Sequence, residues 1–307
     1  MFRLIGDTKI DFIGQRKVSF IVSAILSAIG IFAFVMILLG KAEMGIDFAG
    51  GVMVQGHFES PVSIESVRAA VETEFSDASV TQVADNENKT FIIKTKRPES
   101  DAAGSEKLEA LVGALEKKFP GNAFIRDSEH IIGPSVGESL RKDAVKAILI
   151  SLVGILAYIA FRFDLRSGVA ATIATFHDVL AIIGIFYIFG LEFDLLIVTA
   201  LLTIAGYSLT DTVVVFDRIR ENLRKYRTKG EFVNSVNLSI NETLSRTLNT
   251  SMTLLIVVLI LYAFGGVVLK NFSLALIIGV LIGTYSSIFV ASPILVEWEA
   301  RSPKRFK

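Results

Sequence analysis

Six long apolar segments constrain the fold of this chain more than any other feature of its sequence. Each is close to the roughly 20 residues that an α-helix needs to cross the hydrocarbon core of a bilayer. Hydrophobic residues make up 52% of the 307-residue chain, and its mean hydropathy of +0.57 is too high for an ordinary water-soluble protein. The sequence therefore predicts a polytopic α-helical membrane protein with six transmembrane helices. The predicted spans are about 18–39, 144–161, 168–190, 195–216, 251–268 and 272–296.

Positive charge predicts how these spans are oriented, because Lys and Arg concentrate in cytoplasmic loops. The N-terminus, the short loop 162–167, the longer loop 217–250 and the tail 298–307 are rich in these residues, whereas 190–194 and 265–271 are poor in them. Both termini are therefore expected in the cytoplasm. The first apolar segment is too long for a typical signal-peptide core and no small-residue cleavage site follows it, so we expect it to remain as a span.

The stretch 41–140 is predicted to lie outside the membrane on the opposite face, and it is long enough to fold by itself. Alternating apolar residues predict strands there, and apolar residues at helical spacing predict two helices. The resulting order β-α-β-β-α-β predicts an α+β ferredoxin-like domain, a fold that names no function. The expected strands are 51–59, 78–83, 90–95 and 123–132, the helices are 63–75 and 105–119, and a polar turn is expected at 84–88.

These predictions divide the chain into four parts. Residues 1–40 form a cytoplasmic N-terminus and the first span, and residues 41–140 form the ferredoxin-like periplasmic domain. Residues 141–297 form the other five spans with the cytoplasmic loop 217–250, and residues 298–307 form a cytoplasmic tail.

Asp211 is the most informative single residue, because it lies inside the apolar run 195–216, where the other ionisable group is Tyr207. Hydrocarbon cannot solvate a carboxylate, so such a residue requires protonation, a cationic partner or a water-filled cavity, and each suggests transport. The alternative is a position near the helix end, from which the carboxylate reaches headgroup water. Arg246, about one turn before the fifth span, is a candidate partner, although it also fits an ordinary positive-inside residue.

Asp178 is a second carboxylate within an apolar span, about ten residues into the third one. At the helical rise of about 1.5 Å per residue, this depth corresponds to about 15 Å. Asp178 either belongs to a proton path with Asp211 or makes a hydrogen bond between helices. Its neighbour His177 is interpreted as a hydrogen-bonded packing histidine.

Two further motifs are assigned structural roles. Asp217 and Arg218, in the run DRIREN that follows the fourth span, are expected at an interfacial rim. Gly279 and Gly283 form a G-x-x-x-G face, which is typical of closely packed membrane helices.

The run GIDFAGG joins the first span to the outer domain. Paired glycines such as Gly50 and Gly51 suit a tight turn, because glycine adopts backbone conformations that other residues avoid. Gly45 begins this run, and Asp47 is expected to have a structural role within it.

Several kinds of chemistry are excluded or not indicated. The chain contains no cysteine, which excludes thiolate metal sites, disulfides and cysteine nucleophiles. Its three histidines, His57, His130 and His177, show no metal-ligand spacing, and no Walker A, G-x-S-x-G or H-E-x-x-H motif occurs. Basic and acidic residues balance at 31 each, so net charge does not indicate nucleic-acid binding. We expect no enzymatic activity, no metal and no other cofactor; an ion gradient or a partner would supply any energy.

Four motifs closely resemble the SecF members of the SecD/SecF family of protein-export membrane proteins, within the resistance-nodulation-division (RND) superfamily. They are GIDFAGG at 45–51, GYSLTDTVVVFDRIREN at 206–222, NETLSRT at 241–247 and GTYSSI at 283–288. The second motif, which begins at Gly206, is highly specific, and the resemblance covers nearly the whole chain. It agrees with six spans and one large outer domain after the first.

The resemblance implies a subunit of the Sec protein translocase in the bacterial inner membrane. Such a subunit pairs with SecD and assists the SecY/SecE/SecG channel, with YajC as a further expected partner. It uses proton flow to promote the export of unfolded preproteins. The resemblance also implies that Asp211 and Arg246 take part in proton transport with an acidic partner on SecD, whereas Asp178 is included because of its burial.

Other function classes remain open. The chain could be a scaffold that assembles SecD and the channel, with its polar residues joining helices. It could also be half of an RND-type exporter of small solutes, although the single small outer domain argues against this. The coupling ion is expected to be the proton, and sodium remains an alternative because Ser208, Thr210 and Thr212 lie near Asp211.

Overall fold

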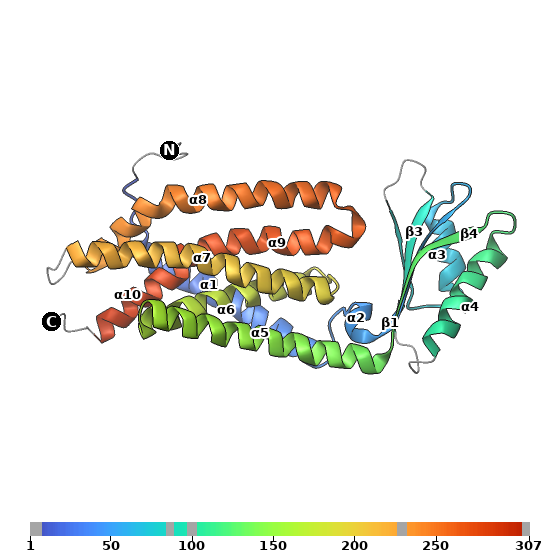
Figure 1. Ribbon diagram of the computed structural model, residues 1–307, viewed down its shortest axis with the longest axis horizontal. Coiled ribbons are helices and arrows are strands. Elements are labelled where there is room, and N and C mark those ends of the chain that lie inside the picture. Colours follow the sequence, from blue (N-terminus) through green and yellow to red (C-terminus); the bar gives the residue numbers. More distant parts are fainter. Residues whose placement is uncertain (1–7, 84–88, 97–102, 226–231, 303–307) are drawn as a thin grey trace.

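The computed structural model describes residues 8–83, 89–96, 103–225 and 232–302. A long bundle of helices is joined at one end to a small α/β domain (Figure 1). Six helical segments among the described residues are long and apolar enough to cross a membrane, which confirms the predicted number of spans. The main helices are α1 (Arg16–Leu38), α5 (Pro134–Arg162), α6 (Leu165–Ile188), α7 (Leu195–Lys225), α8 (Phe232–Phe264) and α9 (Gly266–Ser286).

Two of the six segments contain more than one element. A 3₁₀ turn, η1 (Ile13–Gln15), precedes α1. At the other end of the chain, α9 continues through a π-helical turn, η2 (Ser287–Ala291), into α10 (Ser292–Arg301). Short π-helical turns of this kind occur frequently at functional sites.

The helices extend beyond the apolar segments that predicted them. α7 continues to Lys225 and α8 begins at Phe232, so most of 217–250, expected as a loop, is helical. Hydropathy marks the part of a helix that lies in lipid, and it does not mark where the helix ends. The polar extensions of α7 and α8 are held together by Arg218, whose Nε donates to Glu242 at 2.6 Å. Residues 226–231, and 303–307 of the predicted tail, lie outside the described part of the chain.

The α/β domain has its elements in the predicted order. All neighbouring strands are antiparallel, and the strand order in the sheet is β2-β3-β1-β4. The polar turn expected at 84–88 lies outside the described residues. The elements are β1 (Gly51–Phe58), α3 (Ile64–Glu72), β2 (Ser79–Gln82), β3 (Thr90–Lys96), α4 (Ala103–Lys118) and β4 (Phe124–Ile132).

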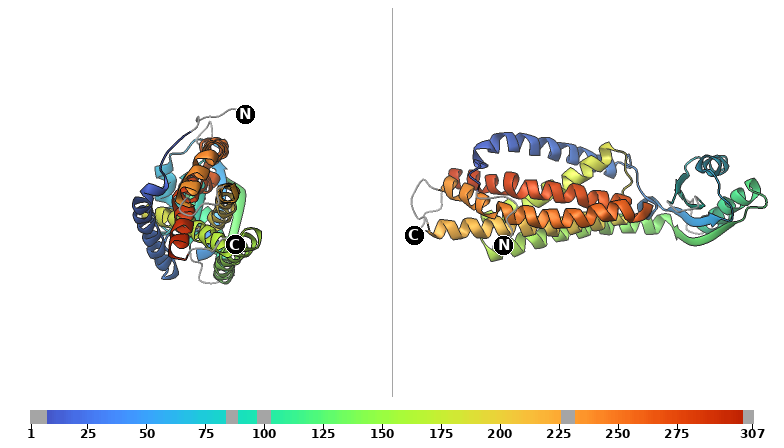
Figure 2. Two further views of the ribbon diagram at one scale, coloured as in Figure 1. Left: turned by 90° about the vertical axis from the view of Figure 1, so that its left-hand side faces the viewer. Right: turned by 90° about the horizontal axis from the view of Figure 1, so that it is seen from above.

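One face of this sheet forms the core of the domain. α3 and α4 cover the face that points away from the helix bundle (Figures 1 and 2). Phe58 is fully buried there and contacts the rings of Phe91 and Phe124. Val67 on α3 and Leu111 on α4 are also fully buried, as their helical spacing predicts.

The GIDFAGG run forms the junction between bundle and sheet. Instead of a simple turn it contains the short helix α2 (Ile46–Ala49), which lies between the two parts (Figure 1). Gly50 has φ +72, in the left-handed region that favours glycine. Asp47 accepts a hydrogen bond from the Leu195 backbone N–H at 3.0 Å. This motif therefore links the start of the domain to the first residue of α7.

The loop between α6 and α7 also contacts the base of the sheet. The Phe193 backbone N–H donates to the Glu43 carbonyl at 2.8 Å. Lys94 pairs with Glu192 at 3.0 Å, and Lys96 pairs with Glu43 at the same distance. The domain is thus connected to the end of the α6–α7 hairpin by backbone and ionic contacts.

Glycines allow α1 and α6 to pack with their backbones nearly touching. A Cβ placed on Gly30 would lie 2.2 Å from the Leu180 carbonyl oxygen, and a Cβ on Gly184 would lie 3.0 Å from the Gly30 nitrogen. Such close approach is typical of membrane helices that meet through small residues.

The G-x-x-x-G face of α9 packs against α7 in the same way. A Cβ on Gly279 would lie 2.4 Å from Ile204 Cγ1, and a Cβ on Gly283 would lie 3.1 Å from Ser208 Cβ. The two glycines therefore bring the backbone of α9 close to the polar part of α7.

We expect Gly30→Ala to destabilise the bundle by about 1–3 kcal/mol, the usual cost of overpacking, because the new methyl group must push α1 away from α6. Thermal unfolding of the detergent-solubilised protein measures this change. Gly154→Ala on α5 is the matched control, since a Cβ there meets nothing within 4 Å. Equal unfolding temperatures for the two variants would contradict the close crossing of α1 and α6.

Candidate functional site

Asp211 is buried between α7 and α8, with hydroxyl groups around its carboxylate. Its side chain projects from α7 toward α8, and the residue is 3% exposed. Thr250 Oγ1 donates to Asp211 Oδ1 at 3.3 Å, and Ser251 Oγ donates to Oδ2 at 3.5 Å. These are long hydrogen bonds, so the carboxylate is only weakly held in its present position.

The Ser251 hydroxyl connects Asp211 to a third helix. Ser251 Oγ lies 2.6 Å from Thr284 Oγ1 on α9, and the Tyr207 hydroxyl on α7 donates to Ser251 Oγ at 3.1 Å. We call Tyr207, Asp211, Thr250, Ser251 and Thr284 the Asp211 cluster. It joins α7, α8 and α9 through hydroxyl groups around one buried carboxylate.

Arg246 lies one helical turn before Thr250 on α8, on an exposed part of the helix. Its backbone carbonyl lies 3.1 Å from Thr250 Oγ1, and it competes with the Thr247 carbonyl at 2.8 Å and with Asp211 Oδ1 for the one hydroxyl hydrogen. The charge of Arg246 attracts the Asp211 carboxylate. Among the described residues, no ion pair within 4.0 Å joins Arg246 to Asp211. Nearby on the same helix, Thr247 Oγ1 and Asn249 Oδ1 are buried without a hydrogen-bond partner. The structure thus brings Arg246 into the same region as Asp211 without a direct contact.

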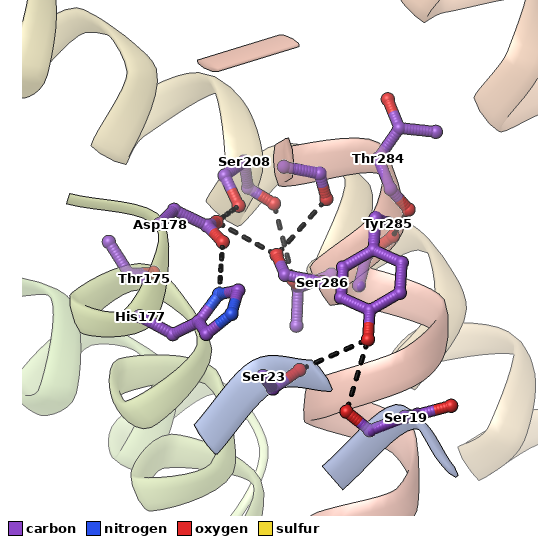
Figure 3. Close-up of polar contacts among 12 residues, drawn as sticks. Ser19, Ser23, Thr175, His177, Asp178, Ser208, Thr284, Tyr285 and Ser286 are labelled. Carbon is purple, nitrogen blue, oxygen red and sulfur yellow. Dashed lines mark hydrogen bonds and ion pairs between the residues drawn. The ribbon is translucent and has the colours of Figure 1, made fainter. Parts of the chain in front are cut away.

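Asp178 belongs to a different group of polar side chains. It is fully buried on α6, and Figure 3 shows hydroxyls from two other helices pointing at its carboxylate. Ser208 Oγ on α7 donates to Oδ2 at 2.5 Å, and Ser286 Oγ on α9 donates to the same oxygen at 2.8 Å. The other oxygen, Oδ1, lies 3.0 Å from His177 Nδ1. We call these four residues the Asp178 cluster.

The hydroxyls that sequence reasoning placed near Asp211 make other contacts. Ser208 bonds Asp178, Thr210 donates to the Gly206 carbonyl at 3.1 Å, and Thr212 donates to the Ser208 carbonyl at 3.2 Å. The hydroxyls around Asp211 come instead from α8. Thr210 and Thr212, directly beside Asp211 in sequence, point to other sides of α7, and the Ser208 hydroxyl, one turn away, binds Asp178. In the described part of the chain, no group of three or more His, Asp or Glu could hold a metal ion.

The other motif residues of α7 lie away from both clusters. Arg218 binds Glu242 and, at 2.5 Å, Glu221, whereas Asp217 is exposed. Gly206 is exposed, and a Cβ there would meet nothing within 4 Å, so its role is not packing within this chain.

The start of α7 carries another carboxylate, just outside the predicted span. Asp194 Oδ1 accepts from the Ile197 backbone N–H at 2.9 Å, which caps the helix. Burial raises the pKa of Asp194, and the neighbouring charges of Asp47 and Glu192 act in the same direction. The charged form is therefore less favourable here than in the unfolded chain.

We expect Ser208→Ala to cost about 1–3 kcal/mol of stability, because the buried Asp178 carboxylate would lose a donor that nothing replaces. Thr210→Ala is the control, since the Thr210 hydroxyl bonds only the carbonyl of its own helix. Unfolding curves of both variants in detergent provide the comparison. A loss for Ser208→Ala no larger than for Thr210→Ala would show that Ser208 contributes little to holding Asp178.

Asp194→Asn should leave the protein at least as stable as the wild type at pH 7, since asparagine caps helices about as well as aspartate and avoids the buried charge. The folded-state pKa of Asp194 is raised, so its charge destabilises the fold above the unfolded-state pKa and this penalty disappears as the pH falls. The difference between variant and wild type should therefore shrink toward pH 4. Thermal unfolding at both pH values tests this, and a variant less stable at pH 7 would contradict it.

A family model described as "Protein export membrane protein SecD/SecF, C-terminal" matches residues 113–301 of the chain. Among curated proteins, the chain is 46% identical over 299 residues to the protein translocase subunit SecF of Thermodesulfovibrio yellowstonii, covering 96% of this chain and 97% of that protein. It is 40% identical to the protein translocase subunit SecF of Vibrio alginolyticus, over 97% of this chain and 92% of that one.

Two solved structures that this chain resembles are also of SecDF proteins. The crystal structure of SecDF, a translocon-associated membrane protein from Thermus thermophilus, matches 96% of this chain with a TM-score of 0.79 and 38% identity. A crystal structure of SecDF in a super-membrane-facing form matches 98% of it with a TM-score of 0.69 and 34% identity. The chain spans 39% and 40% of those two longer chains.

Proposed function

The chain belongs to the SecF branch of the SecD/SecF family of protein-export membrane proteins, and from that premise we propose that it couples proton flow to protein export. In this proposal the chain forms, with SecD, a transporter driven by the proton motive force. The transporter promotes the export of unfolded preproteins through the Sec pathway. Asp211 and Arg246 carry the coupling, and Asp178 supports it.

One observation carries this proposal: the Asp211 carboxylate is buried where three membrane helices meet, and its donors are weakly bonded hydroxyls. A full charge at such a position is costly, so the carboxylate is expected to bind a proton or approach a cation. Arg246, one turn from Thr250, is the cation within reach after a small movement of α8. Asp211 would then alternate between a protonated form held by Thr250 and Ser251 and a charged form paired with Arg246.

The energy of a proton gradient is sufficient to bias such a switch. One charge crossing the membrane gains about 2.3 kcal/mol per 100 mV, and a pH difference adds about 1.4 kcal/mol per unit. These values correspond to more than a tenfold shift in a two-state equilibrium. A single step supplies little work for moving a long polypeptide, so repeated cycles are required.

α7 offers a direct route from Asp211 to the outer domain. The helix is continuous from Asp211 back to Leu195, a distance of about 24 Å at 1.5 Å per residue. At that end its first backbone N–H binds Asp47, and Glu192 of the preceding loop pairs with Lys94. A tilt or shift of α7 would therefore move the base of the sheet. We assign this domain a ferredoxin-like fold on the extracytoplasmic side, supported by its strand order and by the positive charge at the opposite loops.

Two exposed surfaces fit the proposed partner, SecD. Thr203, Gly206 and Thr210 lie at helical spacing on the exposed face of α7, and Arg246 and Thr250 are exposed on α8. Small and hydroxyl-bearing residues are enriched where membrane helices meet. This face is therefore suited to contact another helix bundle.

The outer domain presents the second surface. β4 is an edge strand, and its residues from Ile125 to Ile131 are exposed. A long exposed edge strand promotes unwanted pairing and is usually covered, which fits a subunit that does not act alone. On the family resemblance, we also propose SecY, SecE, SecG and YajC as partners and the bacterial inner membrane as the location. The charge pattern supports an orientation with both termini in the cytoplasm.

We expect Asp211→Asn to abolish the gradient-dependent part of preprotein release without unfolding the protein, because asparagine is similar in size but cannot be charged. Membrane vesicles that contain the complete translocase, with and without an imposed proton gradient, provide the assay. Asp217→Asn is the matched control, since Asp217 is exposed on the same helix and should retain full release. An imposed sodium gradient at constant pH distinguishes sodium from proton coupling.

Assembly must be measured alongside release. If Asp211→Asn assembles normally with SecD and still responds to the gradient, the proposed coupling is wrong. If instead the variant fails to assemble, the residue acts as part of a scaffold, which is the alternative function for this chain.

A further inference from the structure

We propose that His177 and Asp178 form a second proton-binding pair, in which the Nε2 atom of His177 gains and loses the proton. This inference rests on the proposed ion coupling, but it concerns a group that the Asp211 mechanism does not use. The sequence predicts a hydrogen-bonded packing role for His177. Its surroundings in the structure indicate a different role.

The protonation state of Asp178 and its hydrogen bonds together set which nitrogen of His177 carries a hydrogen. Both Ser208 and Ser286 donate to Asp178 Oδ2, so this oxygen is an acceptor with two donors. The remaining oxygen faces His177 Nδ1 at 3.0 Å. When Asp178 is ionised, its carboxylate only accepts hydrogen bonds, so in that state Nδ1 carries a hydrogen and a neutral ring has its lone pair on Nε2.

His177 Nε2 is buried and has no hydrogen-bond partner within the described part of the protein. The whole residue is 3% exposed. An unpaired buried polar atom costs free energy, and a catalytic or proton-binding role is one explanation for such an atom in a folded protein. In its neutral form the ring therefore presents a basic lone pair inside the bundle, next to a negative charge.

Proton uptake at this atom balances the charge of the cluster. The proton adds to the Nε2 lone pair, the Nδ1–H bond remains, and no other bond forms or breaks. A lone carboxylate becomes a carboxylate–imidazolium pair with no net charge. Because a net charge is costly in hydrocarbon, the protonated pair is favoured by its surroundings. In the region that the structure describes, His177 is the one basic side chain with a nitrogen within 4.0 Å of the Asp178 carboxylate.

The contacts around this pair involve α7 and α9 and, through Tyr285, α1. Tyr285 of α9 is titratable, and its ring centroid lies 6.3 Å from that of His177. The Tyr285 hydroxyl donates to the Ser19 carbonyl of α1 at 3.1 Å and lies 3.1 Å from Ser23 Oγ (Figure 3). α7 contributes Ser208 and α9 contributes Ser286. A change of charge at His177 thus acts on the contacts of α6 with α1, α7 and α9.

The pair is separate from the Asp211 cluster. Among the hydrogen bonds of the described residues, the Asp178 cluster and the Asp211 cluster share no side chain. They share helices, because Ser208 and Asp211 lie on α7 and Thr284 and Ser286 lie on α9. Two protonation events could therefore occur at distinct sites and influence each other through helix packing.

The histidine content of the chain makes a direct test practical. Besides His177, the sequence contains only His57 and His130, both on strands of the outer sheet. In a His57→Gln/His130→Gln background, a ¹⁵N-labelled histidine ring reports on His177 alone. Solid-state NMR in lipid bilayers, in complex with SecD, should show Nε2 changing from unprotonated to protonated as the pH falls from 9 to 5. Asp178→Asn should shift this transition to lower pH.

A ring that stays neutral with one unchanged tautomer throughout this range would overturn the proposal. The NMR result does not depend on secretion, so it remains decisive even if Asp211→Asn shows that the proposed function is wrong. Asp178→Asn with no effect on the transition would equally reject the pair.

A second test measures the pH dependence of gradient-driven release in the variant His177→Asn. The asparagine amide can still donate to Asp178 but cannot take up a proton. We expect this variant to lose the pH dependence of gradient-driven release on the acid side while the complex still assembles. Tyr285→Phe is the control, because it removes the hydroxyl contacts to α1 and keeps the histidine. A wild-type pH profile for His177→Asn would contradict the proposal.

Discussion

A carboxylate inside a bilayer must be given hydrogen-bond donors by the protein, since hydrocarbon supplies none. This constraint organises the bundle. Asp178 receives hydroxyls from α7 and α9, and Asp211 receives them from α8. Four helices thus bring polar side chains to two carboxylates, and their relative positions are fixed by contacts that lipid-facing residues cannot provide.

Close approach of the helices is the condition for these contacts. A Ser hydroxyl is short, so Ser286 and Ser208 reach the same oxygen of Asp178 only if α9 and α7 lie nearly in backbone contact. Gly283, beside Ser208, makes this approach possible. The small residues and the polar residues of this bundle are therefore parts of one arrangement, and larger residues at the glycine positions would separate the donors from the acceptor.

The sequence predicted the number of spans and the order of elements in the outer domain, because bilayer thickness and side-chain alternation impose simple patterns. It also identified Asp211 and Asp178, since charged residues stand out in apolar runs. It did not predict Thr250, Ser251 or Ser286 as donors, because Ser and Thr are common in membrane helices and each usually bonds its own backbone. It named Ser208 only as a hydroxyl near Asp211, whereas the Ser208 side chain binds Asp178, because helix rotation is not visible in an apolar run.

The two clusters constrain each other through the helices they share. Thr284 and Ser286 are two residues apart on α9, so they point to nearly opposite sides of the helix, one toward Ser251 and the other toward Asp178. A rotation of α9 that separates Thr284 from Ser251 must also move Ser286 relative to Asp178. Ser208 lies one turn from Asp211 on α7, so a rotation of α7 would move the Asp211 carboxylate and also the Ser208 hydroxyl that binds Asp178. Charge at one carboxylate is therefore linked to packing at the other, without any direct contact between them.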